Sequence, residues 1–287
     1  MSRRPFFVGV GAQRAGTTWI GHFLRRLPDI RFSPIKEVCY FDAKHVEARK
    51  RVISEAMNTR LAVLGLGNYT RKHPLSGLRL CYHYLGIRKL SDDSYRAFFD
   101  ELARSGAVAG EISPSYAMLD EDAVRHMDAL LDQPNVFFVM RNPVDRLLSQ
   151  YSFLSTRPGL KAPGGTDLTD ALCTLCGQSF HVNYPRSLKT YRAVLPEDRF
   201  KTFFTEHLFD PARTQAQCDA LCDYLGIGRS AVPSDRPVNR APAVEISLET
   251  RAILAGKLAK SYSAARAIAG EDLPLSWQRD LALIDQT

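Results

Sequence analysis

At 287 residues, 45% of them hydrophobic and 24% charged, the chain has the size and composition of a folded globular protein with one large α/β domain or two small ones. Lys and Arg number 38 against 31 Asp and Glu, and the net charge of +7 suits an anionic ligand, nucleic acid or an acidic polymer, although a solvated basic surface is the commoner explanation. No apolar run approaches the roughly 18 residues of a membrane span, and the N-terminus leaves no room for a signal peptide, so we expect a cytoplasmic protein.

Strand and helix patterns alternate along the chain. The apolar run 5–12 predicts a first strand, and apolar residues at helical spacing predict a helix that ends before Pro28. Further elements are predicted as strands over 108–113, 135–141 and 199–208, and as helices after Pro143 and over 210–227 and 247–269. The segments 155–167 and 228–246 are rich in Pro, Gly and Ser and read as loops within the domain. This alternation predicts a single α/β domain over 1–287, with a parallel sheet flanked by helices.

Six cysteines raise the question of a metal site or a disulfide framework. Cys173 and Cys176 form a CxxC pair, and Cys218 and Cys222 are four residues apart. Each pair, however, shares a helical face with leucines, and the turn residues that usually accompany zinc ligands are missing. We therefore expect core thiols in a reducing compartment, and no metal.

The loop after the first strand reads GVGAQRAGTTWI and has the outline of a phosphate-binding loop. Gly11 and Gly16 permit a tight wrap, and Thr17 and Thr18 add hydroxyl donors at the start of a helix whose N–H groups would face an anion. The lysine of a nucleotide-binding P-loop is absent because Thr17 occupies its place, which argues against ordinary nucleoside triphosphate chemistry. Arg14, in the middle of the loop, could grip a phosphate or sulfate with its planar fork. The alternative is an arbitrary glycine turn after a strand.

A second polar pair follows the strand predicted over 135–141. Arg141 stands at the carboxyl end of that strand, and Ser149 lies about two turns into the next helix. Ligands of open parallel sheets bind at the carboxyl ends of the strands, so this pair could clamp a second phosphate. In the alternative interpretation, Arg141 pairs with Asp145 or Glu111, and Ser149 faces solvent.

Together, VGAQRAGTTW and VFFVMRNPVDRLLSQY resemble the sulfotransferases that use 3′-phosphoadenosine 5′-phosphosulfate (PAPS). The segment 184–227 is similar to the middle portion of bacterial and heparan-type members, and VNRAP followed by a helix and Trp277 is similar to their C-terminal portion. The resemblance covers nearly the whole chain, most weakly between 43 and 105, and implies a P-loop-like, three-layer fold with a central parallel sheet. The cofactor contacts that it implies are Gly11, Arg14, Ala15, Gly16, Thr17, Thr18 and Trp19 for the 5′-phosphosulfate, and Arg141, Ser149 and Arg240 for the 3′-phosphate.

The resemblance also accounts for the unusual loop. A transferred sulfuryl group carries one charge where a phosphoryl group carries two, so neither Mg²⁺ nor a lysine on a γ-phosphate is implied. Many relatives have a lysine where this chain has Arg14. Arginine is a poorer proton donor, so the role expected of Arg14 is charge stabilisation.

The acceptor side is represented by the segment PIKEVCYFD, which resembles a heparan-type stretch that supplies the catalytic base. Carried over, the base is Glu37, and Lys36 and Asp42 shape the acceptor site. The alternative is that Lys36 and Glu37 form a solvated charge pair before a short strand, with Tyr40 and Phe41 in the core.

Several other residues are secondary candidates. His45 and His83 are rival bases, because some relatives use histidine, and Glu111 and Ser113 of GEISPSYAML are candidates to line the acceptor cleft. Ile112 stands where heparan-type enzymes carry a lysine, which argues against a heavily sulfated or carboxylated polysaccharide as the acceptor. Tyr184 and Tyr191 are either core aromatics or neighbours of adenine.

The function expected from these features is transfer of a sulfuryl group from PAPS to an acceptor hydroxyl, leaving 3′,5′-phosphoadenosine. A carbohydrate is the first choice of acceptor, and a tyrosyl peptide, a lipid-linked sugar or a small metabolite stays open. Two rivals are a P-loop kinase acting on a small molecule, which should need Mg-ATP, and a non-catalytic binding protein for nucleotide or nucleic acid, which should show steep salt dependence and no turnover. Nucleic acid is not the expected partner, because the basic residues are scattered along the chain.

Overall fold

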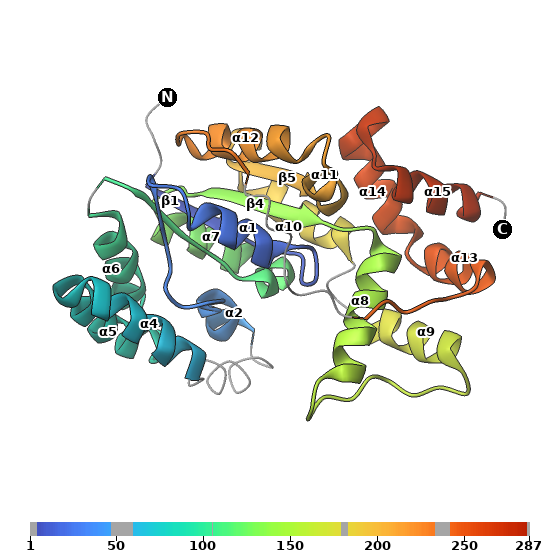
Figure 1. Ribbon diagram of the computed structural model, residues 1–287, viewed down its shortest axis with the longest axis horizontal. Helices are drawn as coiled ribbons and strands as arrows, with labels where there is room; N and C mark the ends of the chain where they lie inside the picture. The colour runs from blue at the N-terminus through green and yellow to red at the C-terminus, as the bar shows by residue number, and fades with distance from the viewer. Residues whose placement is uncertain (1–4, 47–59, 105, 179–182, 233–241, 286–287) are drawn as a thin grey trace.

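A parallel sheet of five strands, in the order β2–β3–β1–β4–β5, forms the centre of the protein (Figure 1). The structure is a computed structural model and describes residues 5–46, 60–104, 106–178, 183–232 and 242–285. The strands are β1 (Phe6–Gly9), β2 (Ile30–Phe32), β3 (Val108–Ile112), β4 (Asn135–Met140) and β5 (Phe200–Phe204). The predicted α/β class, a central parallel sheet flanked by helices, is confirmed.

The register of the sheet brings several strand ends to one edge. β1 is central and pairs with β3 on one side, where Gly9 lies opposite Ile112, and with β4 on the other, where Gly9 lies opposite Phe137. Every residue of β1, β3 and β4 is buried, as expected for parallel strands covered on both faces. The loops that leave β1, β3 and β4 therefore meet at the carboxyl edge of the sheet.

Helices cover both faces of the sheet. Figure 1 shows α1 on the near side, with α7 and α10 behind the strands. The first half of the chain contributes α1 (Thr17–Leu24), α2 (Tyr40–His45), α4 (Arg60–Lys72), α5 (Pro74–Ile87), α6 (Asp92–Ala103) and α7 (Glu121–Leu130). The second half contributes α8 (Pro143–Thr156), α9 (Leu168–Gln178), α10 (Tyr184–Val194), α11 (Thr205–Phe209), α12 (Thr214–Leu225), α13 (Leu248–Lys257), α14 (Ala259–Ala269) and α15 (Leu275–Ile284). In the described ranges no helix is both long and apolar enough to cross a bilayer.

Several predicted elements end differently in the structure. The strand predicted over 199–208 stops at Phe204, because its partner β4 stops at Met140, and the chain continues as the short helix α11. The single helix predicted over 247–269 is interrupted at Leu258, between α13 and α14. The first strand was predicted to extend to residue 12, but it ends at Gly9, after which the glycine loop begins.

Two helical groups occupy opposite ends of the molecule. α4, α5 and α6 lie between β2 and β3 in the sequence and form one end, whereas α13, α14 and α15 form the other (Figure 1). Neither the first group nor β2 was predicted from the sequence. All six cysteines are free thiols, and Cys218 and Cys222 are buried in the core as expected.

Candidate functional site

The glycine loop joins β1 to α1 at the carboxyl edge of the sheet. Gly16 is the N-cap of α1 and has a positive φ of 79°, so the helix begins without a side-chain cap. Arg14 also lies in the left-handed region, at φ 67°. The positive φ favours glycine at position 16, and a Cβ there would also lie 2.8 Å from a ring carbon of Phe209. The uncapped first turn, which includes Thr17 and Thr18, leaves N–H groups that suit an anion.

Two buried side chains that the sequence analysis missed hold this loop. The fully buried Arg146 of α8 donates from Nη1 to the carbonyl oxygen of Gln13 at 3.3 Å and from Nη2 to Oε1 of Gln150 at 2.6 Å. Thr205 Oγ1 lies 2.8 Å from the carbonyl oxygen of Ala15 and 3.0 Å from that of Met140. The contacts to the carbonyl oxygens of Gln13 and Ala15 fix the path of the loop.

The two phosphate motifs of the sequence meet in space. Arg14 Nε donates to Ser149 Oγ at 3.2 Å, across 135 residues of sequence. Arg141 Nη1 donates to the carbonyl oxygen of Arg14 at 3.0 Å. The guanidinium of Arg14 also lies over the ring of Phe153, 4.8 Å from its centroid. Arg14, Arg141 and Ser149 therefore form one cluster at the carboxyl ends of β1 and β4.

This cluster brings two positive charges together. Among the described residues, neither Arg14 nor Arg141 forms an ion pair with a carboxylate. Burial, together with the charge of Arg141, lowers the pKa of Arg14. An anion at this position would relieve the repulsion between the two guanidinium groups. Asp145 and Glu111, the alternative partners of Arg141, are engaged elsewhere.

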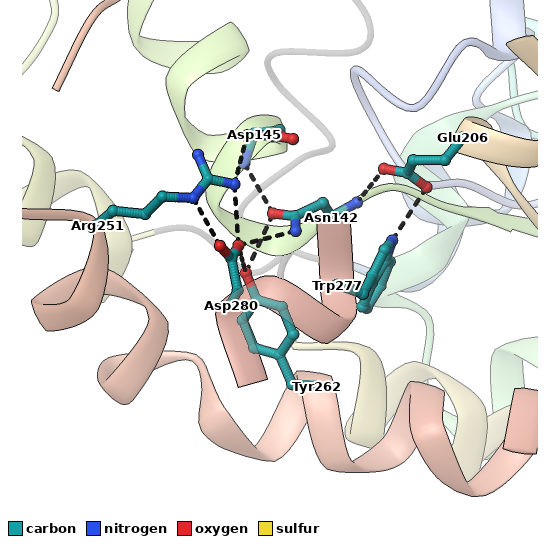
Figure 2. Close-up of polar contacts among 7 residues, drawn as sticks. All are labelled: Asn142, Asp145, Glu206, Arg251, Tyr262, Trp277 and Asp280. Atoms are coloured by element: carbon teal, nitrogen blue, oxygen red, sulfur yellow. Dashed lines mark hydrogen bonds and ion pairs between the residues drawn. The ribbon is translucent and has the colours of Figure 1, made fainter. Parts of the chain in front are cut away.

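The corner that follows Arg141 is anchored by a buried polar network (Figure 2). Glu206 accepts a hydrogen bond from the backbone N–H of Asn142 at 2.8 Å and another from Nε1 of Trp277 at 3.0 Å. The side chain of Asn142 donates from Nδ2 to Asp280 at 2.8 Å and caps α8 through Oδ1, which accepts from the N–H of Asp145 at 3.1 Å. Burial raises the pKa of Glu206, while these hydrogen bonds limit the rise.

Asp280 is the centre of this network. It is buried and accepts hydrogen bonds from Arg251 Nε and from the hydroxyl of Tyr262, both at 2.6 Å. Arg251 Nη2 reaches Asp145 at 2.9 Å, so one arginine bridges α15 and the first turn of α8 (Figure 2). Burial opposes the charge of Arg251, but its hydrogen bonds and the two carboxylates outweigh burial and raise its pKa. The C-terminal helices thereby hold the backbone next to Arg141.

The segment that carries Glu37 lies at the same edge of the sheet. The N–H of Val38 donates to Oε2 of Glu111 at 3.0 Å, and the N–H of Cys39 donates to Oγ of Ser113 at 3.2 Å. Ser113 in turn donates its N–H to the carbonyl oxygen of Gly9, the last residue of β1, at 2.9 Å. Glu37 is therefore tied to the end of β3, beside the strand that leads into the glycine loop.

Glu111 is buried, whereas the acceptor contact predicted for it requires an accessible carboxylate. It is fully buried and accepts hydrogen bonds from Val38 N, Ser113 Oγ, and the hydroxyls of Tyr95 and Tyr116. Burial raises the pKa of this carboxyl, and its donors limit the rise. Enclosed in this way, Glu111 offers no surface to an acceptor and serves to fix the 38–39 backbone.

The remaining residues of the acceptor segment divide between surface and core. The Glu37 carboxylate lies 3.8 Å from the Lys36 ammonium, and both side chains are about half exposed. Asp42 is fully buried in α2, so it cannot contact an acceptor as predicted. Tyr40 and Phe41 lie in the core, but they begin a helix instead of the short strand considered in the alternative interpretation.

Two predicted cofactor contacts have packing roles. The indole of Trp19 is buried against Phe23 and Phe209, and the backbone N–H of Trp19 donates to the carbonyl oxygen of Gly16 at 2.9 Å. Ala15 is fully buried, and its N–H donates to the carbonyl oxygen of Ala12 at 3.2 Å. These residues shape the loop without directing a polar group outward.

The remaining candidates are two histidines, two tyrosines and Arg240. His45 Nε2 lies 2.7 Å from His126 Nδ1, at the end of α2, and His83 packs against Tyr82 on α5. Tyr184 is a core residue whose hydroxyl donates to the carbonyl oxygen of Arg141 at 2.6 Å. Tyr191 is likewise in the core. Arg240 lies outside the described residues.

Comparison with solved structures identifies the architecture. A sulfotransferase from Alicyclobacillus acidocaldarius superposes with a TM-score of 0.65 at 20% identity, covering 97% of this chain and 100% of that one. The sulfotransferase domain of the Synechococcus PCC 7002 olefin synthase superposes with a TM-score of 0.52 at 18% identity, covering 79% and 75% of the two chains. The chain has the sulfotransferase fold. No protein-family model matches the sequence, and a search of curated proteins finds no match.

Within the sulfotransferase fold, the sequence motifs and the structural cluster coincide. The glycine loop follows the central strand β1, and Arg141 and Ser149 follow the adjacent strand β4. No three His, Cys, Asp or Glu side chains gather into a potential metal site in the part of the chain that the structure describes.

Proposed function

We propose that the protein is a sulfotransferase that moves a sulfuryl group from PAPS to an acceptor hydroxyl. The observation that carries the proposal is the cluster of Arg14, Arg141 and Ser149 beside the uncapped N-terminus of α1, with no carboxylate paired to either arginine among the described residues. A neutral ligand would leave this charge uncompensated, whereas a ligand with two anionic ends matches it.

The donor set fits PAPS. The first-turn N–H groups of α1, Thr18 and Arg14 suit its 5′-phosphosulfate, and Arg141 and Ser149 suit its 3′-phosphate. When bound, PAPS supplies an activated sulfuryl group with a phosphate as its leaving group. Arg14 and the loop N–H groups would neutralise the charge that develops on that leaving oxygen.

Glu37 is our proposed general base. An acceptor oxygen forms a bond to sulfur as the bond between sulfur and the departing phosphate oxygen breaks, and the hydroxyl proton passes to Glu37. The exposure of Glu37 and its position at the carboxyl edge of the sheet support this role. Lys36, 3.8 Å away, is proposed to help shape the acceptor site. A carbohydrate is the proposed acceptor, on the resemblance of the segment KEVCYFD to heparan-type enzymes.

Calorimetric titration with 3′,5′-phosphoadenosine, 5′-AMP and Mg-ATP tests the cofactor. A hydrogen bond to a charged group contributes about 1.5–3 kcal/mol, so Arg141→Ala should weaken binding of the bisphosphate roughly 10- to 100-fold and change 5′-AMP much less. Arg125→Ala is the matched control, since Arg125 is an exposed arginine of α7 paired with Glu121. Equal bisphosphate affinity in Arg141→Ala and the wild type would refute the 3′-phosphate assignment, and preference for Mg-ATP would favour a kinase.

A second measurement addresses the base. With an acceptor found by screening against labelled PAPS, Glu37→Gln should reduce kcat by roughly 10²–10⁴-fold and leave binding of 3′,5′-phosphoadenosine unchanged. Full turnover in Glu37→Gln would show that another group is the general base, and His45→Gln would be the next variant to measure.

A further inference from the structure

The surface of α5 carries an apolar stripe that faces solvent. Leu75, Leu78, Tyr82 and Leu85 follow each other at spacings of three, four and three residues, so they lie along one face of the helix. Their exposed fractions are 57–76%. Leucines scattered singly over a surface need no explanation, but a continuous row on one helix does.

The opposite face of the same helix is already buried. Gly77, Leu80, Tyr84 and Ile87 face the protein interior, where α5 packs against α4 and α6. A helix that is apolar on both sides is normally enclosed on both sides. Val63 and Leu64 of the neighbouring helix α4 are exposed as well.

The charged residues in the sequence of α4 and α5 are all basic. Between residues 60 and 91 the sequence contains no Asp or Glu, although the chain as a whole has 31. Arg71 and Lys72 stand at one end of the stripe, Arg88 and Lys89 stand at the other, and all four are exposed. Arg79 lies beside the row and is half exposed. Its one described acidic contact is Glu101 of α6, 3.5 Å away.

We propose that the α4–α5 hairpin is a docking surface for the face of an anionic lipid bilayer. Apolar side chains on a convex helix can enter the boundary between headgroups and acyl chains, while basic side chains at both ends reach lipid phosphates. Tyr82, apolar in its body and polar at its tip, suits that interface. Nucleic acid would match the charge but would leave the leucines exposed, and an acidic polysaccharide would do the same.

The hairpin is also in contact with the acceptor segment. Gly65 of α4 lies against Pro34, three residues before Glu37, so closely that a Cβ there would be 2.1 Å from the Pro34 carbonyl oxygen. Figure 1 shows the hairpin at the end of the molecule remote from α13, α14 and α15. The stripe shares no residue with the cluster of Arg14, Arg141 and Ser149, and the proposal does not depend on the proposed reaction.

Cosedimentation of the full chain with vesicles tests the proposal. One set of vesicles is phosphatidylcholine alone, and the other is phosphatidylcholine and phosphatidylglycerol in equal parts. The wild type should bind the anionic set, bind the neutral set weakly, and release from the anionic set as salt is raised. The variant with Leu75→Ser, Leu78→Ser and Tyr82→Ser should lose at least about tenfold in affinity.

Two further variants make the result decisive. Leu248→Ser with Leu275→Ser is the matched control, because these leucines are 76% and 69% exposed at the other end of the molecule, and it should bind as the wild type does. Lys72→Gln with Lys89→Gln should weaken binding to anionic vesicles by roughly fivefold per charge and about 25-fold together. This charge variant keeps the test valid even where the serine variant does not fold.

Three outcomes would overturn the proposal. The first is no binding to either vesicle set, and the second is equal binding by the wild type and the charge variant. The third is a dimer, seen by analytical ultracentrifugation without any vesicle binding, that the stripe variants dissociate. In that case the stripe is an interface with a second copy of the chain.

Discussion

Replacing Asp280 by asparagine tests whether the C-terminal helices control the corner next to Arg141. One carboxylate oxygen of Asp280 accepts from Arg251 Nε, and the other accepts from Asn142, Tyr262 and Arg251 Nη2. An asparagine has nearly the same shape, but in either orientation its NH₂ group faces donors that need an acceptor. Asp280→Asn therefore removes a buried charge and places an NH₂ group, itself a hydrogen-bond donor, opposite the donors that the carboxylate accepts from.

The expected cost follows from the burial of the pair. Breaking a buried ion pair by removing one partner costs about 3–5 kcal/mol. The Arg251 side chain is 22% exposed and keeps Asp145 at 2.9 Å, so the lower end applies. We expect a loss of about 3 kcal/mol in the free energy of unfolding, and a Tm lowered by about 6–12 °C for a chain of this size.

The decisive assay compares two ligands. Calorimetry should show that the preference for 3′,5′-phosphoadenosine over 5′-AMP falls about tenfold in Asp280→Asn, because a displaced Asn142 moves Arg141. Asp128→Asn is the control, since Asp128 forms a largely buried pair with Arg199 just before β5, at the amino end of that strand. It should lower the Tm and leave the preference unchanged. A lower Tm with an unchanged preference in Asp280→Asn would show that the network only stabilises the fold.

Three shorter predictions concern the loop, a thiol and a histidine. Gly16→Ala should abolish measurable binding of 3′,5′-phosphoadenosine, because the new Cβ meets Phe209 at a positive φ, and wild-type affinity in that calorimetric titration would contradict the described loop. Burial raises the pKa of Cys218 to about 12, so at about pH 8 iodoacetamide should alkylate it more than about 10³-fold more slowly than free cysteine, as peptide mass spectrometry can measure. Burial lowers the pKa of His207 below its ordinary 6.5, and Arg213 donates to Nε2, so the folded state keeps the ring neutral. Between that lowered pKa and 6.5 the unfolded chain binds the additional proton, so stability falls as pH falls, and His207→Gln should flatten the decline of Tm between about pH 7 and about pH 5.5.

The sequence analysis succeeded where the signal is local. β3 and β4 were predicted within a residue of their observed ends because they are continuous buried runs between recognisable loops. The glycine loop was predicted because its strand, glycines and hydroxyls are contiguous. By contrast, β2 has three residues and no distinctive pattern, so it was missed.

The sequence analysis failed where a residue's environment comes from distant parts of the chain. Glu111 was predicted as an acceptor contact, and nothing local indicated that Tyr95, Tyr116 and Val38 would enclose it. Arg146 gave one usable signal, since it is an arginine between the apolar Val144 and Leu147 at the start of a helix. The partners that make Asp280 important lie 18 to 138 residues away, and no spacing rule reaches that far.

The contacts between Arg14, Ser149 and Arg141 also bear on how this cluster would distinguish ligands. The side chain of Arg14 donates to Ser149 and its main-chain carbonyl oxygen accepts from Arg141, so this one residue joins the two ends of the cluster. A ligand that binds at one end would leave the hydrogen bond at the other end in place. A ligand that spans both ends would replace the Arg14–Ser149 and Arg141–Arg14 hydrogen bonds together. We therefore expect a ligand that occupies only one end of the cluster to gain much less than half of the binding free energy of a ligand that spans both ends.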